Sequence, residues 1–268
     1  MATLEPRTGA PLLDVRSVSL RYRDTDGGTL EILRDVSLHV NAGDFVALIG
    51  PSGGGKTTLL SLIAGLEASS SGEIALRGDP HTTRLGHVGY MPQRDLLLPW
   101  RSALDNAAAG LEARGVTKSE ARERARALFQ QFGLSGFERA WPATLSGGMR
   151  QRVAFARAVL AGGELLLLDE PFGALDALTR LSLQRWLAEM CAALKLTCLL
   201  VTHDLDEPLF LADRVYVLTP RPGRILLERP VPTPRPRTPE TLSIPEATAL
   251  KGELRSALLG SQEGALAL

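Results

Sequence analysis

The most chemically suggestive stretch of the sequence is a glycine-rich run that fits the pattern G-x-x-x-x-G-K-[ST]. It reads Gly50, Pro51, Ser52, Gly53, Gly54, Gly55, Lys56, Thr57. A predicted strand precedes the run and a predicted helix follows it, which is the context that this motif requires. Its backbone N–H groups can wrap a chain of phosphates, and Lys56 can reach the β- and γ-phosphates. The Thr57 hydroxyl would bind Mg²⁺, and Thr58 would add a contact on the α-phosphate side. The run therefore predicts a nucleotide site rather than a structural turn.

An acidic pair follows a continuous apolar run at 165–168. Such a run is typical of a strand buried in a parallel sheet, so Asp169 and Glu170 would lie at the carboxyl edge, where open α/β folds bind ligands. Asp169 could hold Mg²⁺ through water, and Glu170 could position or deprotonate an attacking water. Pro171 and Gly173 form a separate turn afterwards, which disfavours a surface turn at the acidic pair.

A second phosphate-type motif lies far downstream, at Ser146, Gly147 and Gly148, where a helix over 147–160 is predicted to begin. The glycines permit close backbone approach, and the free N–H groups and dipole of a helix N-terminus attract an anion. The chain thus has two helix starts suited to phosphate. Either both serve one nucleotide, or the second serves a nucleotide held by another copy.

Two more polar residues follow predicted strands and would reach the same sheet edge. His203 ends the strand predicted over 197–202 and could donate a hydrogen bond to the γ-phosphate. A lone histidine is usually structural, but its place beside the Asp169 strand favours the functional role. Gln93 follows the strand predicted over 87–91 and could contact Mg²⁺ or the attacking water.

The composition is that of a globular protein without a general attraction to polyanions. Of 268 residues, 30 are basic and 30 acidic, so the net charge is zero. Arg150, Arg152 and Arg157 could be read as a nucleic-acid patch, but the charge balance and the lack of interleaved aromatic residues favour a helix face with salt bridges. Cys191 and Cys198 lack metal-ligand spacing and are expected to be buried thiols.

Alternating strands and helices predict an α/β fold with a parallel sheet and crossover helices. Between about 102 and 160 the strand signal fades, and helices are predicted over 102–114, after Thr117 with a capping box to Glu120, and over 147–160. This region is interpreted as a helical insertion. A proline-rich extended connector at 229–239 and a final helix at 245–259 follow.

With these motifs in place, the sequence from about 12 to 228 resembles the ATP-binding subunit of ABC transporters. The run at 50–57 is similar to the Walker A motif. Residues 165–169 are similar to the Walker B motif, and Glu170 is similar to the catalytic glutamate that follows it. Residues 145–151 are similar to the signature motif, which is the family's most specific mark. Gln93 matches the Q-loop, Asp176 the D-loop and His203 the switch histidine. Tyr22 falls where the family places an aromatic that stacks on adenine.

The resemblance implies a P-loop NTPase core, an antiparallel β subdomain and an inserted helical subdomain. We expect an ATPase domain at 12–240, with the helical subdomain at about 95–162, and a helical tail at 241–268. The implied catalytic residues are Glu170, His203 and Gln93. ATP would be bound by Tyr22, by the run at 50–58, and by Ser146, Gly147, Gly148 and Asp176, whereas Mg²⁺ would be bound by Thr57, Gln93 and Asp169.

The resemblance is closest to importers of nitrate, sulfonate and taurine. It rests on 95–100, on 171–180 and on 221–225. Importers of thiamine pyrimidine precursors and of aromatic acids share these features, so the cargo stays open. Gly54 stands where the family usually has alanine or a small polar residue, and we expect it to cost only loop entropy. Pro208 stands where alanine is usual, and it should be tolerated in a first helical turn.

The implied partners are a second copy in an ATP-sandwich homodimer, membrane permease subunits and, indirectly, an extracytoplasmic solute-binding protein, with no nucleic acid. Leu96 to Trp100 could contact the permease or could pack into the helical insertion. No apolar run approaches the roughly 20 residues of a spanning helix, and the first residues lack the apolar core of a signal peptide. The implied location is therefore the cytoplasmic face of the bacterial inner membrane, peripheral to the permease.

Three rival functions are weighed against this one. ABC ATPases of DNA repair or translation carry long coiled coils or two ATPase units, and neither pattern occurs in the sequence. Importers of polyamines or sugars usually have a longer C-terminal regulatory domain than the 45 or so residues after Gly223 provide, while amino-acid importers remain an alternative. A degenerate module without turnover is disfavoured because Glu170 and His203 are both present.

Overall fold

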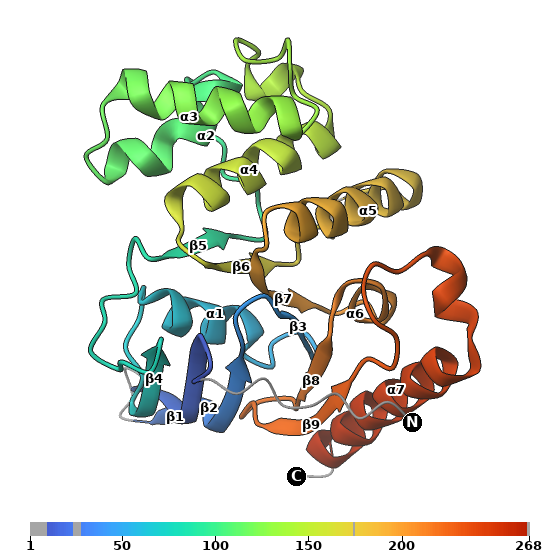
Figure 1. The fold of residues 1–268 in the computed structure, drawn as a ribbon. Coiled ribbons are helices and arrows are strands. Elements are labelled where there is room, and N and C mark those ends of the chain that lie inside the picture. Colours follow the sequence, from blue (N-terminus) through green and yellow to red (C-terminus); the bar gives the residue numbers. More distant parts are fainter. Residues whose placement is uncertain (1–9, 24–27, 174, 267–268) are drawn as a thin grey trace.

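Two sheets, described here from a computed structural model, form the framework of the molecule (Figure 1). The structure describes residues 10–23, 28–173 and 175–266. The first sheet is antiparallel, with the order β2-β1-β4 and the bounds Leu13–Arg23 for β1, Thr29–Val40 for β2 and Ser71–Leu76 for β4. The second sheet has the order β5-β6-β7-β3-β8-β9. Its strands are β3 (Phe45–Ile49), β5 (Val88–Met91), β6 (Leu165–Asp169), β7 (Thr197–Thr202), β8 (Arg214–Leu218) and β9 (Ile225–Pro230).

The larger sheet is parallel except at its last strand, where β9 runs antiparallel to β8. The predicted α/β fold with its parallel core and separate antiparallel sheet is therefore confirmed. The sequence does not predict β9, and it indicates only an extended connector from 229 onwards. Every second residue of β9 is exposed, so this edge strand has a weak apolar signal.

The central strand β3 divides the hydrophobic core into two layers. All five of its side chains are buried, and they alternate between the layers, with Phe45, Ala47 and Ile49 in one and Val46 and Leu48 in the other. The layer around Val46 and Leu48 is closed by α1 (Lys56–Ala64) and the antiparallel sheet. The opposite layer is closed by helices, α4 (Gly147–Ala161), α5 (Ala177–Ala193) and α6 (Asp206–Leu211).

The helical insertion is built on α4. Helices α2 (Ala103–Ala113) and α3 (Lys118–Gln131) lie on the far side of α4 from the antiparallel sheet (Figure 1). An aromatic cluster joins this region to α5, with ring centroids 5.0 Å apart for Phe132 and Trp186 and 5.4 Å for Phe155 and Trp186. Edge-on aromatic pairs of this kind are worth about 0.5–1.5 kcal/mol beyond area burial. The cluster therefore couples the position of α4 to that of α5.

The predicted capping box at the start of α3 is only half formed. The Thr117 hydroxyl accepts from the Glu120 N–H at 3.4 Å, as expected of an N-cap. The Glu120 carboxylate does not return this contact, because it accepts from Arg124 at 2.5 Å. An i,i+4 ion pair on the exposed helix face thus competes with the reciprocal cap.

The C-terminal helix α7 (Pro245–Leu266) extends seven residues beyond the predicted end at 259. It packs onto the main core through Leu250 and Leu254. Short 3-10 turns over Pro142–Thr144 and Pro239–Ser243 complete the described elements. In the described part of the chain, no helix combines the length and hydropathy needed to cross a membrane.

Candidate nucleotide and catalytic site

The glycine-rich loop connects the end of β3 to the start of α1. Gly53 and Gly55 have φ values of +76° and +98°, a region where a β-carbon is strained. The buried Lys56 ammonium donates to the carbonyl oxygens of Gly50 and Pro51, both at 2.9 Å, so the loop curls around its own lysine. Burial lowers the Lys56 pKa. An anionic phosphate beside this desolvated cation would therefore be strongly favoured.

Gly54 has a packing role that the sequence did not reveal. A β-carbon at this position would lie 2.8 Å from the Thr219 carbonyl oxygen and 3.2 Å from that of Pro51. The expectation that Gly54 costs only loop entropy is therefore incomplete, because the segment after β8 packs directly on the loop. Pro208, in contrast, lies in the first turn of α6 as expected.

Thr57 and Asp169 form the predicted metal-binding edge. The Thr57 hydroxyl donates to Oδ1 of Asp169 at 3.2 Å, and the Tyr90 hydroxyl approaches Oδ2 at 3.5 Å. Burial raises the Asp169 pKa. Hydroxyl and carboxylate oxygens are the hard ligands that Mg²⁺ prefers, and Mg²⁺ commonly takes only one or two carboxylates besides substrate phosphates. The described residues accordingly include no cluster of three or more metal-ligating side chains, and the pair present fits Mg²⁺ bound together with a nucleotide.

Glu170 is the point where three sequence-predicted residues meet. Gln93 Nε2 donates to one of its carboxylate oxygens at 3.1 Å, and His203 Nδ1 lies 3.3 Å from the other. The backbone at Glu170 has a φ of +45°, and its N–H donates to the Val201 carbonyl at 2.9 Å. A strained, tightly held carboxylate at the end of β6 is an arrangement typical of functional sites.

A cavity of about 550 Å³ joins the loop to this carboxylate. Its volume is in the range of pockets that hold small molecules, about 300–1,000 Å³. The cavity is lined by strand residues of the antiparallel sheet and by residues that follow strands of the larger sheet, namely Tyr22, Leu30, Ile32, Ser52, Gly53, Gly55, Lys56, Thr57, Thr58, Gln93, Glu170 and Arg221. The structure thus brings Tyr22 into the same space as the phosphate loop.

Two lining residues have contacts that the sequence did not predict. The Tyr22 hydroxyl donates to the Glu67 carboxylate, which raises the Tyr22 pKa to about 12. Arg221 donates to the Gly53 carbonyl at 3.4 Å and brings a guanidinium to the phosphate loop. The only signal for Arg221 in the sequence is its position three residues after a predicted strand that ends at the ligand-binding edge.

The second phosphate-type motif lies in a different cavity. Ser146 is the N-cap of α4, and its hydroxyl accepts from the Met149 N–H at 3.3 Å. This cavity of about 410 Å³ lies between α4 and α5 and is lined by Ser146, Gly148, Met149, Arg152, Leu178, Thr179, Ser182 and Leu183. None of these residues lines the cavity at the phosphate loop. Within one chain, the two motifs therefore do not share a cavity.

The predicted D-loop residue lies near the second motif. Asp176 is the N-cap of α5 and accepts from the Thr179 N–H at 3.0 Å. A β-carbon on Gly148 would lie 3.3 Å from the Thr179 methyl group, and one on Gly147 would lie 3.2 Å from Leu175. The starts of α4 and α5 are therefore packed together, and both present free helix N–H groups.

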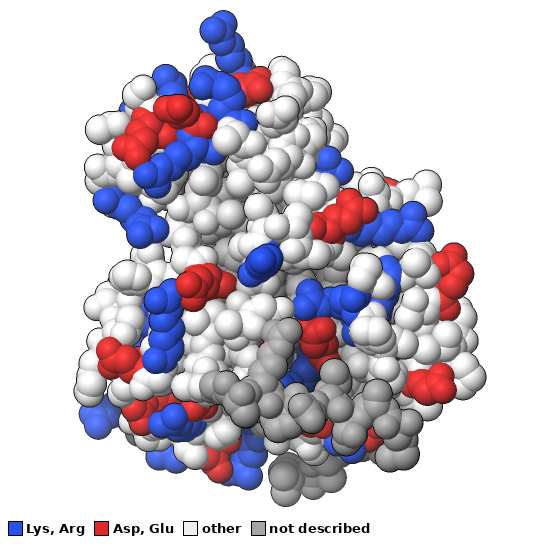
Figure 2. Space-filling model, viewed as in Figure 1, with Lys and Arg blue, Asp and Glu red and all other residues white. Residues whose placement is uncertain are grey.

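Two of the three arginines of α4 hold the segment that follows Gln93. Arg150 pairs with Asp95 at 3.2 Å, and Arg157 donates to the Leu96 carbonyl at 2.7 Å. Arg152 lies 5.1 Å from the Trp186 ring centroid. Figure 2 also shows basic and acidic groups interspersed on the face in view. These arginines are therefore structural, although only Arg150 forms the expected type of salt bridge.

The residues from Leu96 to Trp100 differ in whether they pack into the core or face solvent. Leu97 is 8% exposed and belongs to the main core. Leu96 and Trp100, in contrast, are 59% and 71% exposed. The run thus packs through one residue and leaves two large apolar side chains on the surface.

Comparison with known proteins places the chain in a family. The family model described as ABC transporter matches residues 33–173, more than half of the chain. The chain belongs to the ABC transporter family. It is 43% identical to the aliphatic sulfonates import ATP-binding protein SsuB of Rhodopseudomonas palustris over 97% of its own length and 88% of that protein. It is 42% identical to the formylaminopyrimidine import ATP-binding protein ThiZ of Halalkalibacterium halodurans, over 92% and 96% of the two chains.

Solved structures agree with this assignment. The dimeric cassette MJ0796 in a post-hydrolysis state with ADP and Pi is 27% identical and has a TM-score of 0.70, covering 82% of this chain and 99% of that one. The fold also matches cbiO1 of Clostridium perfringens, part of the transporter complex cbiONQ, with a TM-score of 0.73 over 91% of this chain and 95% of that one. The family is one of ATPases, so the chain is an ATP-binding ATPase subunit.

Glu207 is a buried acid that lines the same small cavity as Glu170. It is 4% exposed, and burial raises its pKa to about 7. Gln184 donates to its Oε1 at 3.4 Å, whereas its Oε2 is buried without a hydrogen-bond partner in the described part of the chain. Glu207 and Glu170 both line a cavity of about 20 Å³, large enough for about one water molecule. These contacts fit a carboxyl group that carries a proton near neutral pH.

We predict that Glu207→Gln changes how stability depends on pH. The folded pKa of about 7 exceeds the ordinary value of 4.5, so the stabilising proton is fully bound below about 4.5 and is lost as the pH rises through 7. Glutamine cannot ionise. The unfolding free energy of the variant, relative to that of the wild type, should therefore rise by about 1–3 kcal/mol between pH 5 and pH 8.5. Urea unfolding at a series of pH values measures this difference.

The matched control is Glu123→Gln, which removes a carboxylate from an exposed position on α3. This control should run parallel to the wild type across the pH range. A constant difference between Glu207→Gln and the wild type would contradict the burial of a protonated acid at this position.

Proposed function

We propose that this chain is the ATP-hydrolysing subunit of an importer for small organic anions of the aliphatic sulfonate type. The observation that carries the proposal is the similarity to import ATP-binding proteins over almost the whole chain. The SsuB proteins of Rhodopseudomonas palustris and Rhodococcus jostii are 43% and 45% identical to it. The alternative cargo is formylaminopyrimidine, which is favoured by the 42% identity to ThiZ over 96% of that protein.

In the proposed site, each group has one task. Tyr22 stacks on adenine, the 50–58 loop and Lys56 hold the phosphates, and Arg221 adds positive charge beside the loop. Thr57, Asp169 and Gln93 would hold Mg²⁺, which would neutralise phosphate charge when bound. Glu170 accepts a proton from the attacking water, and His203 donates a hydrogen bond to the γ-phosphate. The contacts from Gln93 and His203 to Glu170 support the role given to Glu170, because they hold its carboxylate in place.

The signature motif is proposed to complete the site of a second copy. Ser146 and Gly148 line a cavity separate from the phosphate loop, and Gly147 lies between them at the start of α4, so the motif is free to contact a nucleotide held by another chain. Asp176, at the adjacent helix start, would contact the same nucleotide. The resemblance to a solved dimeric cassette supports a head-to-tail dimer. ATP would close this dimer, and hydrolysis would let it open.

The proposed permease contact is the exposed pair Leu96 and Trp100. Both are large, apolar and solvent-facing. Arg150 of α4 donates to the Asp95 carboxylate and Arg157 of α4 donates to the Leu96 carbonyl, so their segment is held against α4. A displacement of Gln93 would thereby be transmitted along this segment to Leu96 and Trp100. The location proposed for the chain is the cytoplasmic face of the bacterial inner membrane, bound to the permease. A solute-binding protein would deliver the cargo from the other side.

The proposed division of the chain follows the same roles. An ATPase domain spans 12–240, a helical subdomain at about 95–162 carries the signature motif and the permease contact, and 241–268 forms a helical tail. The packing of Leu250 and Leu254 in the main core supports a docked tail rather than an independent unit.

We predict that Glu170→Gln abolishes steady ATP hydrolysis while keeping nucleotide affinity. The amide preserves size but cannot accept the proton of the attacking water, and general-base help is worth about 10²–10⁴ in rate. Phosphate release measures turnover, and fluorescent-nucleotide titration measures binding. Turnover near the wild-type rate in this variant would rule out Glu170 as the base.

Ser146→Arg should leave ATP binding to the monomer intact but prevent ATP-induced dimerisation. The long cation would occupy the cavity at the start of α4 without touching the phosphate loop of its own chain. Sedimentation with ATP measures the effect by comparing the Glu170→Gln variant with the double variant that also carries Ser146→Arg. The Glu170→Gln background is used because slow hydrolysis preserves the ATP-bound dimer. Normal ATP-bound dimers of the double variant would contradict the shared site.

The cargo is tested with the transporter purified together with its membrane subunits and solute-binding protein. We expect ATP-dependent uptake of ethanesulfonate into vesicles, and no uptake with Glu170→Gln. Uptake of formylaminopyrimidine instead of the sulfonate would select the alternative cargo. Uptake of neither would overturn both cargo assignments, while the hydrolysis assays would still test the ATPase separately.

A further inference from the structure

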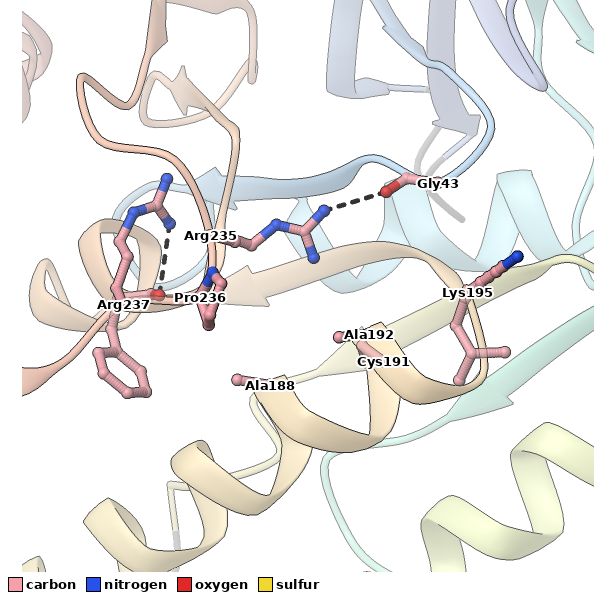
Figure 3. A pocket seen from close by; sticks show the side chains of 10 residues that line it. Gly43, Ala188, Cys191, Ala192, Lys195, Arg235, Pro236 and Arg237 are labelled. Atoms are coloured by element: carbon pink, nitrogen blue, oxygen red, sulfur yellow. Dashed lines mark hydrogen bonds between the residues drawn. The ribbon is translucent and has the colours of Figure 1, made fainter.

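A surface pocket of about 370 Å³ lies at the sheet edge opposite the nucleotide site. It is formed between the end of α5, the turn before β3, and the connector after β9 (Figure 3). Gly43 precedes β3 and Leu196 precedes β7, so the pocket is at the amino ends of these strands, whereas the phosphate loop follows their carboxyl ends. None of its lining residues has a task in the ATPase mechanism.

Three cationic side chains line this pocket, Lys195, Arg235 and Arg237. Arg235 is neutralised, because it donates to both oxygens of Asp213 at 2.8 and 2.7 Å and to the Gly43 carbonyl at 3.0 Å. Lys195 is exposed, and no carboxylate lies within ion-pair distance of it among the described residues. The pocket therefore has more positive than negative charge.

Arg237 is the most unusual of the three cations. It is 7% exposed, and its guanidinium donates to uncharged acceptors, the Thr233 carbonyl at 2.9 Å and the Phe210 carbonyl at 3.3 Å. In the described part of the chain, it forms no ion pair. A buried cation without a carboxylate partner is costly unless an anion compensates it.

The remaining lining is largely apolar. It consists of Gly43, Ala188, Cys191, Ala192, Leu196, Phe210 and Pro236. The carbonyl groups at the end of α5 would repel an anion if they were free, but the N–H groups of Lys195 and Leu196 donate to the carbonyls of Ala192 and Cys191 at 3.2 and 3.0 Å. The negative end of the helix dipole is therefore largely satisfied within the backbone.

We propose that this pocket binds a small organic anion that has a compact apolar body and one acidic head group, a sulfonate or a carboxylate. The head group would lie against Arg235, which Figure 3 shows between Arg237 and Lys195, and the apolar body would cover Ala188, Ala192 and Pro236. Such a ligand would bridge α5 to the connector. Helix α5 begins after its N-cap Asp176, and α6, which carries the pocket residue Phe210, begins shortly after His203. The bound anion would therefore stiffen two helices that start at the ATPase site. This site is independent of the proposed cargo.

The test is calorimetric titration of the full chain with 1-butanesulfonate. Sulfate supplies the charge without the apolar body, and butan-1-ol supplies the apolar body without the charge. We expect saturable binding of butanesulfonate at least about tenfold tighter than that of either control ligand, together with a rise of a few degrees in the melting temperature at saturation. Equal binding of sulfate or butan-1-ol, or no binding of butanesulfonate, would overturn the proposal.

Variants locate the site on the molecule. Arg237→Gln should weaken butanesulfonate binding by about tenfold or more, since it removes the buried charge. Arg237 also anchors the connector, so Lys195→Gln and Ala192→Trp provide a test at exposed positions, the first removing charge and the second filling the pocket. Both should weaken binding, whereas Lys118→Gln, an exposed cation at the start of α3, should not. Wild-type affinity in Lys195→Gln and Ala192→Trp would overturn the site.

Discussion

The parallel register of β6, β7 and β3 is the constraint on which the rest of the site depends. Ile49 pairs with Thr202, and Asp169 pairs with Val201, so the three strands end at nearly the same level. The residues that follow them are the phosphate loop, Glu170 and His203. Chemistry contributed by segments more than 100 residues apart is therefore brought together by backbone hydrogen bonds. The strand ends are close enough for the side chains to meet directly, and Gln93 and His203 lie 3.1 and 3.3 Å from the Glu170 carboxylate.

The same register explains why the sheet must be covered on both faces. Strand β3 sends alternate side chains into two separate cores, and its five residues are all buried. The antiparallel sheet and α1 cover one face, and α4 to α6 cover the other. Each cover also brings a residue that is proposed to contact nucleotide, because Tyr22 comes from the first and Ser146 from the second. Burial of the sheet and assembly of the nucleotide site are thus achieved by the same elements.

How far the sequence could predict this arrangement depends on the kind of signal. The phosphate loop, Asp169 and Glu170 were predictable because spacing and the preceding apolar strands restrict them to one sheet edge. The strand β9 was missed because its alternate residues are solvent-exposed, and Arg221 was missed because a single arginine in a turn has no pattern of its own. The packing of Thr219 against Gly54 joins residues far apart in sequence, so only the fold reveals it. The sequence likewise does not show that Leu97 is buried while Leu96 and Trp100 are exposed, because this depends on which side of the segment packs against the core.

The two edges of one parallel sheet have opposite requirements. At the carboxyl edge, a desolvated lysine and the N–H groups of the loop require an anion, and the sequence motifs show which one. At the amino edge, the connector after β9 brings Arg235 and Arg237 over the end of α5, but Asp213 is hydrogen-bonded only to the first among the described residues. A helix of 17 residues spans the distance between the edges, roughly 25 Å at 1.5 Å per residue. Its first residue follows Asp176, and its last turn forms the wall of the second pocket. A rigid helix with a charged site at each end provides a direct mechanical link between them, which a flexible loop in the same place would not.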